Sequence, residues 1–211
     1  MSNSSEYLFY MAPRKNAPWI ALSGVFSYNR INTSDFSQFL QSIADPFVNN
    51  RRDSLQIEEK PLHDYVPLYW ATHTPMQYVV KLPQDQLVFF VLEAAQILKL
   101  SGVITTDGNA ASNDTKFFRG DGALPHLDWE IIQTPNCWSR EYKRKKCAEV
   151  LVPDKIEPTL IRQICVFSTS SSKHLKTAIC ETAQNLKYYE VHIPNLIKLV
   201  KVDPNLYYGQ E

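Results

Sequence analysis

Apolar residues along this 211-residue chain fall into short runs, and prolines or polar clusters separate most of these runs. Runs rich in β-branched and aromatic residues that end at Pro, Asn or Asp are typical of strands. The strands that this pattern predicts are Tyr7–Met11, Val66–Ala71, Gln77–Val80, Leu87–Leu92, Cys147–Val152, Gln163–Ser168 and Tyr188–Ile193.

Helices are predicted where apolar positions recur every three or four residues. One helix begins at about Asn16, which is a plausible N-cap, and Pro18 is tolerated in its first turn. The segment Ser34–Asn50 is expected to be partly helical, with Pro46 starting a new turn or a short second helix. Further helices are predicted at Glu93–Lys99 and at Ser171–Ala183, where serines can cap the first turn.

The segment Gly102–Ala123 holds four of the six glycines of the chain, mixed with Asn, Asp and Ser. This composition predicts a long irregular loop, and long loops in compact domains often carry function. Helices and short strands without regular βαβ alternation favour an α+β fold with largely antiparallel sheets. The length fits one domain spanning residues 1–211.

Composition argues against a strongly basic protein, a membrane-spanning protein and a disulfide-rich protein. Lys plus Arg and Asp plus Glu number 22 each, so any site for a polyanion must come from local clustering of charge. The longest apolar run, Leu87–Leu92, is too short to span a bilayer, and no signal peptide is recognised. The four cysteines show no CxxC spacing, which favours reduced thiols and a cytoplasmic location.

The sequence lacks the motifs of several common metal, nucleotide and hydrolase sites. The five histidines are scattered and form no HxH or HxxxH pair, so the sequence predicts no metal site. The glycine-rich motifs of dinucleotide-binding, P-loop and α/β-hydrolase folds are absent from the sequence.

Glu149 lies inside a segment that otherwise reads as a buried strand, after the basic run that ends at Lys146. Strand interiors disfavour Glu, so a buried Glu needs a partner or a chemical role. An edge-strand Glu that points to solvent is the alternative interpretation.

Two other groups can serve an anionic or planar ligand. Arg51 and Arg52 are either a solvated helix end or a fork for phosphate oxygens, which guanidinium groups bind in pairs. Tyr69 either packs in the core or stacks on a planar ligand.

The glycine-rich segment also suits a path for single-stranded nucleic acid. Bases can stack on Phe117 or Phe118 while Lys116 and Arg119 contact phosphates. A basic run before Glu149 strengthens this interpretation, although such runs are usually solvated faces. That run consists of Arg140, Lys143, Arg144, Lys145 and Lys146.

Taken in order, these segments resemble the DarT family of DNA ADP-ribosyltransferase toxins. The most specific are Asp64-Tyr-Val-Pro67 and Ala148-Glu-Val-Leu-Val152. The other matching segments are Phe9-Tyr-Met11, Asn16-Ala-Pro-Trp-Ile20, Asn50-Arg-Arg52, Leu68-Tyr-Trp70, Thr74-Pro-Met-Gln-Tyr78, Asp107-Gly-Asn-Ala-Ala111, Thr115-Lys-Phe117 and Leu206-Tyr-Tyr208.

The resemblance implies a PARP-like ADP-ribosyltransferase fold, in which NAD⁺ lies in a cleft between two packed, mostly antiparallel sheets. The family signature places Glu on a third strand, Tyr on a second and commonly His on a first. These positions fall on Glu149, Tyr69 and Tyr10 here, so Tyr replaces the usual His. Ala12 also replaces a hydroxyl residue, and His73 stands where Arg is often found.

The implied activity is transfer of ADP-ribose from NAD⁺ onto a base of single-stranded DNA, without a metal. Glu149 would stabilise the charge on the ribose, Arg51 or Arg52 would assist, and Tyr69 would stack against nicotinamide. The residues expected to bind NAD⁺ are Tyr10, Ala12, Asn16, Arg51 and Tyr69. The residues expected to line the DNA path are Asp107, Asn109, Thr115, Lys116, Phe117, Arg119, Lys143, Arg144 and Lys145.

Several alternatives remain open from the sequence. The family includes thymine-modifying and guanine-modifying enzymes, and the substitutions at Tyr10, Ala12 and His73 slightly favour guanine. An RNA-directed ADP-ribosyltransferase and an inactive single-strand-binding module are the other candidates. The resemblance also implies a partner antitoxin, typically a hydrolase that removes ADP-ribose, and no association with a membrane.

Overall fold

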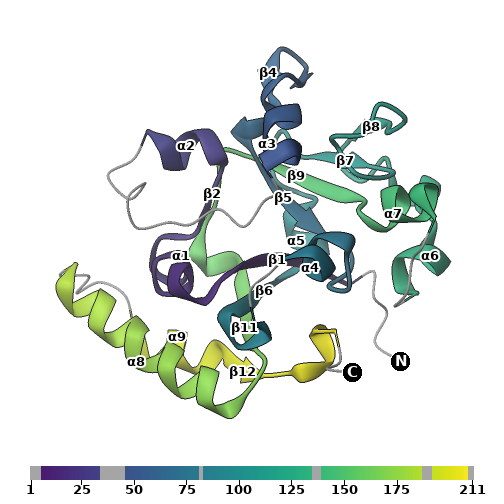
Figure 1. Cartoon of the computed structure of the whole chain (residues 1–211). Coiled ribbons are helices and arrows are strands. Elements are labelled where there is room, and N and C mark those ends of the chain that lie inside the picture. The colour runs from purple at the N-terminus through teal and green to yellow at the C-terminus, as the bar shows by residue number, and fades with distance from the viewer. Residues whose placement is uncertain (1–5, 34–45, 81–82, 135–138, 187–191, 209–211) are drawn as a thin grey trace.

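The computed structural model describes residues 6–33, 46–80, 83–134, 139–186 and 192–208 (Figure 1). The helices are α1 (Ala17–Ser23), α2 (Tyr28–Asn32), α3 (Pro46–Asp53), α4 (Pro75–Val79), α5 (Ala94–Ile97), α6 (Trp129–Gln133), α7 (Arg140–Lys146), α8 (Thr169–Asn185) and α9 (Ile193–Leu199). The strands are β1 (Tyr7–Pro13), β2 (Val25–Phe26), β3 (Gln56–Ile57), β4 (Lys60–Pro61), β5 (Tyr65–Tyr69), β6 (Leu87–Glu93), β7 (Ile104–Thr106), β8 (Phe117–Arg119), β9 (Glu149–Pro153), β10 (Lys155–Ile156), β11 (Ile161–Val166) and β12 (Val200–Val202).

Eight strands form one sheet in the order β12-β11-β6-β1-β5-β9-β7-β8, and only the β11–β12 pair is parallel. β1 pairs with β6 along its whole length, but it pairs with β5 only where Phe9 faces Tyr69. The sheet therefore consists of two four-stranded halves that one residue pair joins. The largely antiparallel arrangement agrees with the sequence prediction.

The main hydrophobic core lies between the sheet and the helices α1, α5 and α8. In α8 the buried residues Leu175, Ile179 and Ala183 recur every four positions, so they share one face of the helix. The Ser168 hydroxyl caps this helix by accepting a hydrogen bond from the Ser171 amide at 3.2 Å. Figure 1 shows α8 and α9 at one end of the molecule, and α3, β7 and β8 toward the other.

Helix α1 confirms the prediction near Asn16, which occupies the N-cap position, although its side chain makes no capping hydrogen bond. The helix ends at Gly24, whose φ is +89°. A Cβ atom there would lie 2.1 Å from the carbonyl oxygen of Ile156. Glycine therefore permits the close approach of β2 to β10.

Three sequence predictions are wrong in part. Residues Gln77–Val79 belong to α4 rather than to a strand, because Thr74 caps the helix and Pro75 suits its first turn. The segment Gly102–Ala123 is not wholly irregular, since it contains the hairpin β7–β8. Ile193 begins α9 and is not in a strand, while the rest of the predicted strand Tyr188–Ile193, apart from His192, lies outside the described residues.

The other predicted helices and strands are confirmed, with ends shifted by a few residues. Pro46 begins α3 as expected, and residues 34–45 lie outside the described part of the chain. Within the described ranges, no helix is both long and apolar enough to cross a membrane. The described cysteines Cys147, Cys165 and Cys180 are free thiols.

Candidate active site

Glu149 is the first residue of β9, and its side chain is fully buried. Its carboxylate accepts hydrogen bonds from Arg52 Nη1, at 3.1 Å to Oε2, and from the Ala110 amide, at 2.9 Å to Oε1. It stands opposite Tyr69 in the antiparallel β5–β9 pair, so the two side chains project from the same face. This geometry excludes the solvent-facing glutamate that the sequence alone allowed.

Arg52 lies on the last turn of α3, and its side chain is only 8% exposed. Burial opposes its charge, but attraction and hydrogen bonding by Glu149 outweigh burial and raise the pKa of Arg52. Its Nη2 atom is buried and has no hydrogen-bond partner among the described residues. The neighbouring Arg51 is exposed instead, and it donates to Asn113 Oδ1 at 2.7 Å.

Helix α3 is held in place by His63, a residue to which the sequence assigned no role. The His63 side chain is buried, and its Nε2 lies 3.1 Å from the Asn49 carbonyl oxygen and 3.0 Å from Asp53 Oδ1. Both acceptors flank Arg52 in the helix. Tyr28 packs against the imidazole with ring centroids 4.4 Å apart. No spacing or periodicity marks this residue in the sequence.

Tyr69 stands opposite Glu149, and Tyr10 is an electrostatic neighbour of Tyr69. Burial, followed by the charge of Glu149, raises the pKa of Tyr69 well above its usual range. Tyr10 faces Phe90 of β6 and packs on the main core, and burial raises its pKa to about 12. Both phenols therefore stay protonated at neutral pH.

Ala12, Asn16 and Arg51 are the other residues expected to bind NAD⁺. Strand alternation points Tyr10 and Ala12 to the face of β1 opposite that of Phe9, the partner of Tyr69. Ala12 is buried in the main core, and Asn16 is buried at the start of α1. Their roles in binding NAD⁺ stay predictions.

Apart from Lys145, the residues expected to contact DNA divide into two groups. One group consists of residues that hydrogen-bond to one another, in the loop 107–115 and on the helix α7: Asp107, Asn109, Thr115 and Arg144. Lys116, Phe117, Arg119 and Lys143 are exposed, with Phe117 at 39% and the Arg119 side chain at 81%. The outward group presents the aromatic and cationic surface that single-strand binding requires.

Two exposed or half-buried cations in this region have acidic partners. Arg119 pairs with Glu58 at 2.6 Å, and Lys145 pairs with Asp128 at 3.1 Å. Lys146 is buried, and its Nζ donates to the carbonyl oxygen of Ile132 at 2.8 Å, at the end of α6. Only part of the basic run therefore faces solvent, and contact of these residues with DNA stays a prediction.

His73, where the family often has Arg, supports the C-terminal segment. Its Nε2 lies 3.0 Å from the Tyr207 carbonyl oxygen, and its ring meets the edge of Tyr208 at 5.0 Å. Burial lowers the pKa of His73. The residue is thus engaged with Tyr207 and Tyr208.

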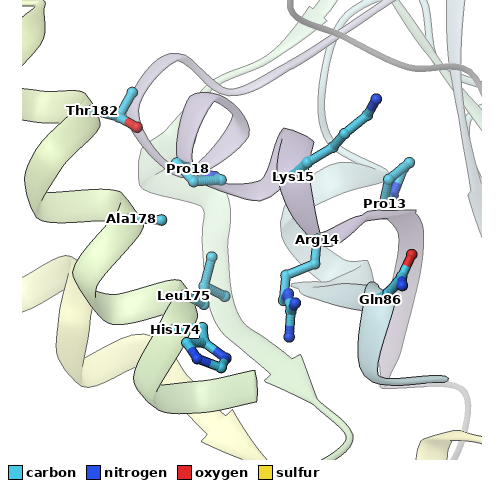
Figure 2. Close-up of a pocket in the computed structure, with 9 residues that line it drawn as sticks. All are labelled: Pro13, Arg14, Lys15, Pro18, Gln86, His174, Leu175, Ala178 and Thr182. Atoms are coloured by element: carbon cyan, nitrogen blue, oxygen red, sulfur yellow. The ribbon is translucent and has the colours of Figure 1, made fainter. Parts of the chain in front are cut away.

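Figure 2 shows a pocket of about 450 Å³ between the start of α1 and the face of α8. Arg14, Lys15, Gln86 and His174 are among its lining residues. None of the residues predicted to act in catalysis lines it, so it is separate from the Arg52–Glu149 pair. Over the described parts of the chain, no three His, Cys, Asp or Glu residues lie close enough together to hold a metal ion.

Comparison with protein families identifies a match over nearly the whole chain. The family model described as "ssDNA thymidine ADP-ribosyltransferase, DarT" matches residues 9–208. A DNA ADP-ribosyl transferase of Thermus sp. (strain 2.9) is 31% identical over 141 residues, which cover 61% of this chain and 67% of the relative. A DNA ADP-ribosyl transferase–DNA ADP-ribosyl glycohydrolase fusion protein of Thermosipho africanus is 28% identical over 179 residues, covering 82% of this chain and 45% of the fusion.

Solved structures agree with this match. Thermosipho africanus DarTG in complex with ADP-ribose superposes with a TM-score of 0.79 at 26% identity, covering 96% of this chain and 51% of that chain. Thermus sp. 2.9 DarT in complex with NAD⁺ gives a TM-score of 0.72 at 22% identity, covering 99% and 100% of the two chains. The predicted fold class is therefore confirmed.

Proposed function

The chain belongs to the DarT family of single-stranded DNA ADP-ribosyltransferases, and from this premise we propose that it transfers ADP-ribose from NAD⁺ onto a base, thymine or guanine, of single-stranded DNA. The observation that carries the proposal is the fully buried Glu149 carboxylate, fixed between Arg52 and the Ala110 amide and facing Tyr69. A buried charge held by several donors at one strand end is costly, and functional sites are where such costs are retained.

The residues around the pair suit a dinucleotide substrate. Arg52 Nη2 is a buried cationic donor that lacks a partner among the described residues, and a ribose hydroxyl or phosphate oxygen can accept from it. The Tyr69 phenol stays protonated and offers both a donor and a ring face. Tyr69 would contact nicotinamide, and Tyr10, Ala12, Asn16 and Arg51 would contact the rest of NAD⁺.

The reaction breaks the bond between the ribose C1′ and the nicotinamide nitrogen, and the electron pair leaves with nicotinamide. Positive charge then develops on the ribose, and the Glu149 carboxylate stabilises it. The DNA base forms the new bond to C1′ through a ring atom or an exocyclic nitrogen, and Glu149 accepts the proton that the base loses. Arg52, which donates to the Glu149 carboxylate at 3.1 Å, holds it in position.

The exposed group of loop and helix residues would receive the DNA strand. Phe117 offers a ring for base stacking, and Lys116, Arg119 and Lys143 offer charge to phosphates. A single strand suits such a site because its bases are already unpaired and can reach the catalytic residues at low cost. Asp107, Asn109 and Thr115 would shape the loop along this path.

A hydrolase that removes ADP-ribose from DNA would neutralise this activity. The Thermosipho relative joins a DNA ADP-ribosyl transferase to a DNA ADP-ribosyl glycohydrolase in one protein. This fusion supports the proposal that the protein is a toxin and that its antitoxin partner is a glycohydrolase of that type.

The test uses two single-stranded oligonucleotides that differ in one position, where one has its only thymine and the other its only guanine. Each is incubated with the protein and NAD⁺ and then weighed by mass spectrometry. We expect one oligonucleotide to gain an ADP-ribosyl group as NAD⁺ loses nicotinamide, and the modified strand identifies the base. The Glu149→Gln variant, which keeps the shape of the side chain, is the control and should form the adduct far more slowly.

Two results would contradict the proposal. Transfer to a matched RNA but to neither DNA would point to an RNA-directed enzyme. Absence of any adduct, with a melting temperature unchanged by millimolar NAD⁺, would point to a binding module, because a bound substrate stabilises the folded state.

A further inference from the structure

Arg144 on α7 makes internal contacts on every side of its guanidinium. Nη1 donates to Asp107 Oδ1 at 3.2 Å and to Thr115 Oγ1 at 3.4 Å. Nε and Nη2 donate to the two carboxylate oxygens of Glu141 at 3.1 and 2.8 Å. The Arg144 side chain is only 12% exposed, so two carboxylates neutralise a cation that is largely withdrawn from solvent.

The backbone of Arg144 supports the same loop. Its carbonyl oxygen accepts a hydrogen bond from the Asn109 amide at 2.9 Å. A Cβ atom on Gly108 would lie 2.4 Å from Arg144 Nη1 and 3.1 Å from its carbonyl oxygen. The loop therefore packs directly on Arg144, and a side chain at position 108 would displace the guanidinium.

This loop reaches the catalytic carboxylate through Ala110 and Thr106. The Ala110 amide donates to Glu149 Oε1, and the Thr106 hydroxyl accepts from the Glu149 amide at 2.8 Å and donates to the Gly108 carbonyl at 2.6 Å. The position of one carboxylate oxygen thus depends on the path of residues 107–110. Arg144 fixes that path at its start and at its end.

We propose that Arg144 is a positioning residue, which braces the loop 107–115 so that the Ala110 amide orients Glu149, and that it is not a contact for DNA phosphates. The inference rests on the proposed function for its activity readout. It replaces the sequence prediction that Arg144 lines the DNA path. The carboxylates of Glu141 and Asp107 already balance the charge of the guanidinium and occupy its donors.

The test compares Arg144→Gln with Lys143→Gln, since Lys143 is the preceding residue of the same helix and is exposed. We expect Arg144→Gln to lower kcat at saturating DNA by roughly tenfold to a hundredfold, as orientation losses typically do, and to leave the salt dependence of DNA binding unchanged. Lys143→Gln should instead weaken DNA binding and reduce the salt slope by about 0.7.

Two further variants distinguish loss of the Arg144 contacts from general destabilisation of the fold. Gly108→Ala pushes the Arg144 guanidinium away from the loop without removing a charge and should reproduce the kcat loss. Arg144→Lys keeps the charge but cannot bridge both carboxylates, so its kcat should lie between those of wild type and Arg144→Gln. A reduced salt slope with normal kcat in Arg144→Gln would overturn the proposal.

Amide hydrogen exchange separates failure of this inference from failure of the proposed function. Exchange at Ala110 should accelerate in Arg144→Gln and Gly108→Ala and stay unchanged in Lys143→Gln, whether or not DNA is modified. Unchanged protection of Ala110 in both loop variants would show that Arg144 does not brace the loop.

Discussion

Arg51 and Arg52 are neighbours in the chain, yet one belongs to the exposed rim of the site and the other to its buried floor. We call Arg52, Tyr69, Thr106, Ala110 and Glu149 the floor, and Arg51, Lys116, Phe117, Arg119 and Lys143 the rim. Successive residues of a helix point about 100° apart, so α3 sends its two arginines to different surroundings. Charges of the floor are buried and fixed, whereas those of the rim, including the exposed Arg119–Glu58 pair, lie in solvent and are screened by salt.

This difference assigns separate tasks to the two regions. A fixed, buried charge can stabilise a transition state, since its orientation costs nothing at the moment of reaction. A solvated charge contributes mainly to the capture of a polyanion, and its contribution falls as salt rises. Substitutions in the floor should therefore change stability and kcat, and substitutions in the rim should change affinity.

The largest expected effect is on the stability of the Arg52→Ala variant. Loss of Arg52 leaves the Glu149 charge buried without its cation, which should lower the free energy of unfolding by about 3–5 kcal/mol. Urea unfolding of the purified variant measures this change. The matched Arg51→Ala variant removes an exposed side chain and should stay within about 0.5 kcal/mol of wild type. Equal losses in both variants would remove the distinction between floor and rim.

The second effect concerns His63, which holds α3 at the turn that carries Arg52. His63→Phe keeps a ring against Tyr28 but removes the hydrogen-bond donor to Asn49 and Asp53. We expect kcat to fall by roughly tenfold, because a small displacement of Arg52 disturbs the orientation of Glu149. Steady-state kinetics with saturating NAD⁺ and DNA measures it. The exposed His174 on α8 is the control position, and an equal loss in His174→Phe would refute a specific role.

A smaller effect is expected for the rim. Lys116→Ala should reduce the slope of log affinity for single-stranded DNA against log salt by about 0.7, as loss of one phosphate contact does. The rate at saturating DNA should remain near that of wild type. Binding titrations at several salt concentrations test this, and an unchanged slope would show that Lys116 does not meet a phosphate.

The smallest effect is the pH dependence that Tyr10 contributes. Burial raises the pKa of Tyr10 from 10.0 to about 12 in the folded protein. The folded state therefore retains the proton longer than the unfolded state, so this contribution to stability is complete below pH 10 and is lost as pH rises through about 12. Tyr10→Phe should flatten the decline of unfolding free energy over this range. Tyr142→Phe, at an exposed phenol of α7, is the control and should leave the decline unchanged.

The sequence predicted much of the floor, but it could not predict which arginine belongs to it. Glu149 stood out because a charged residue interrupts an apolar strand, and burial next to Arg52 is the compensation that such a residue requires. The choice between Arg51 and Arg52 depends on the rotational phase of α3 relative to β9. That phase is a property of tertiary packing, which a single sequence does not display.

The polar loop before β8 shows a second use of residue types that the sequence could not distinguish from DNA binding. Asp107, Asn109 and Thr115 were expected to line the DNA path, yet they bond to the loop backbone and to Arg144. Irregular backbone leaves amides and carbonyls without regular partners, and nearby polar side chains satisfy them. The pattern of residue types is the same for a loop that binds itself and for one that binds a ligand.

The structure of α4 shows how local signals can also be missed. The residues Gln77–Val80 read as a strand because they are apolar and aromatic. Thr74 and Pro75 together are a helix start, and this capping decides the outcome for a segment so short.

The central claim is that the Glu149 carboxylate stabilises the ribose of NAD⁺ as its bond to nicotinamide breaks. The most direct measurement is the single-turnover rate of nicotinamide release, with bound DNA, in wild type and in Glu149→Gln, together with the affinity of each for NAD⁺. Glutamine keeps the volume and the acceptor for the Ala110 amide but removes the charge. We predict a rate lower by on the order of 10²–10³-fold at nearly unchanged affinity, and a rate equal to that of wild type would contradict the claim.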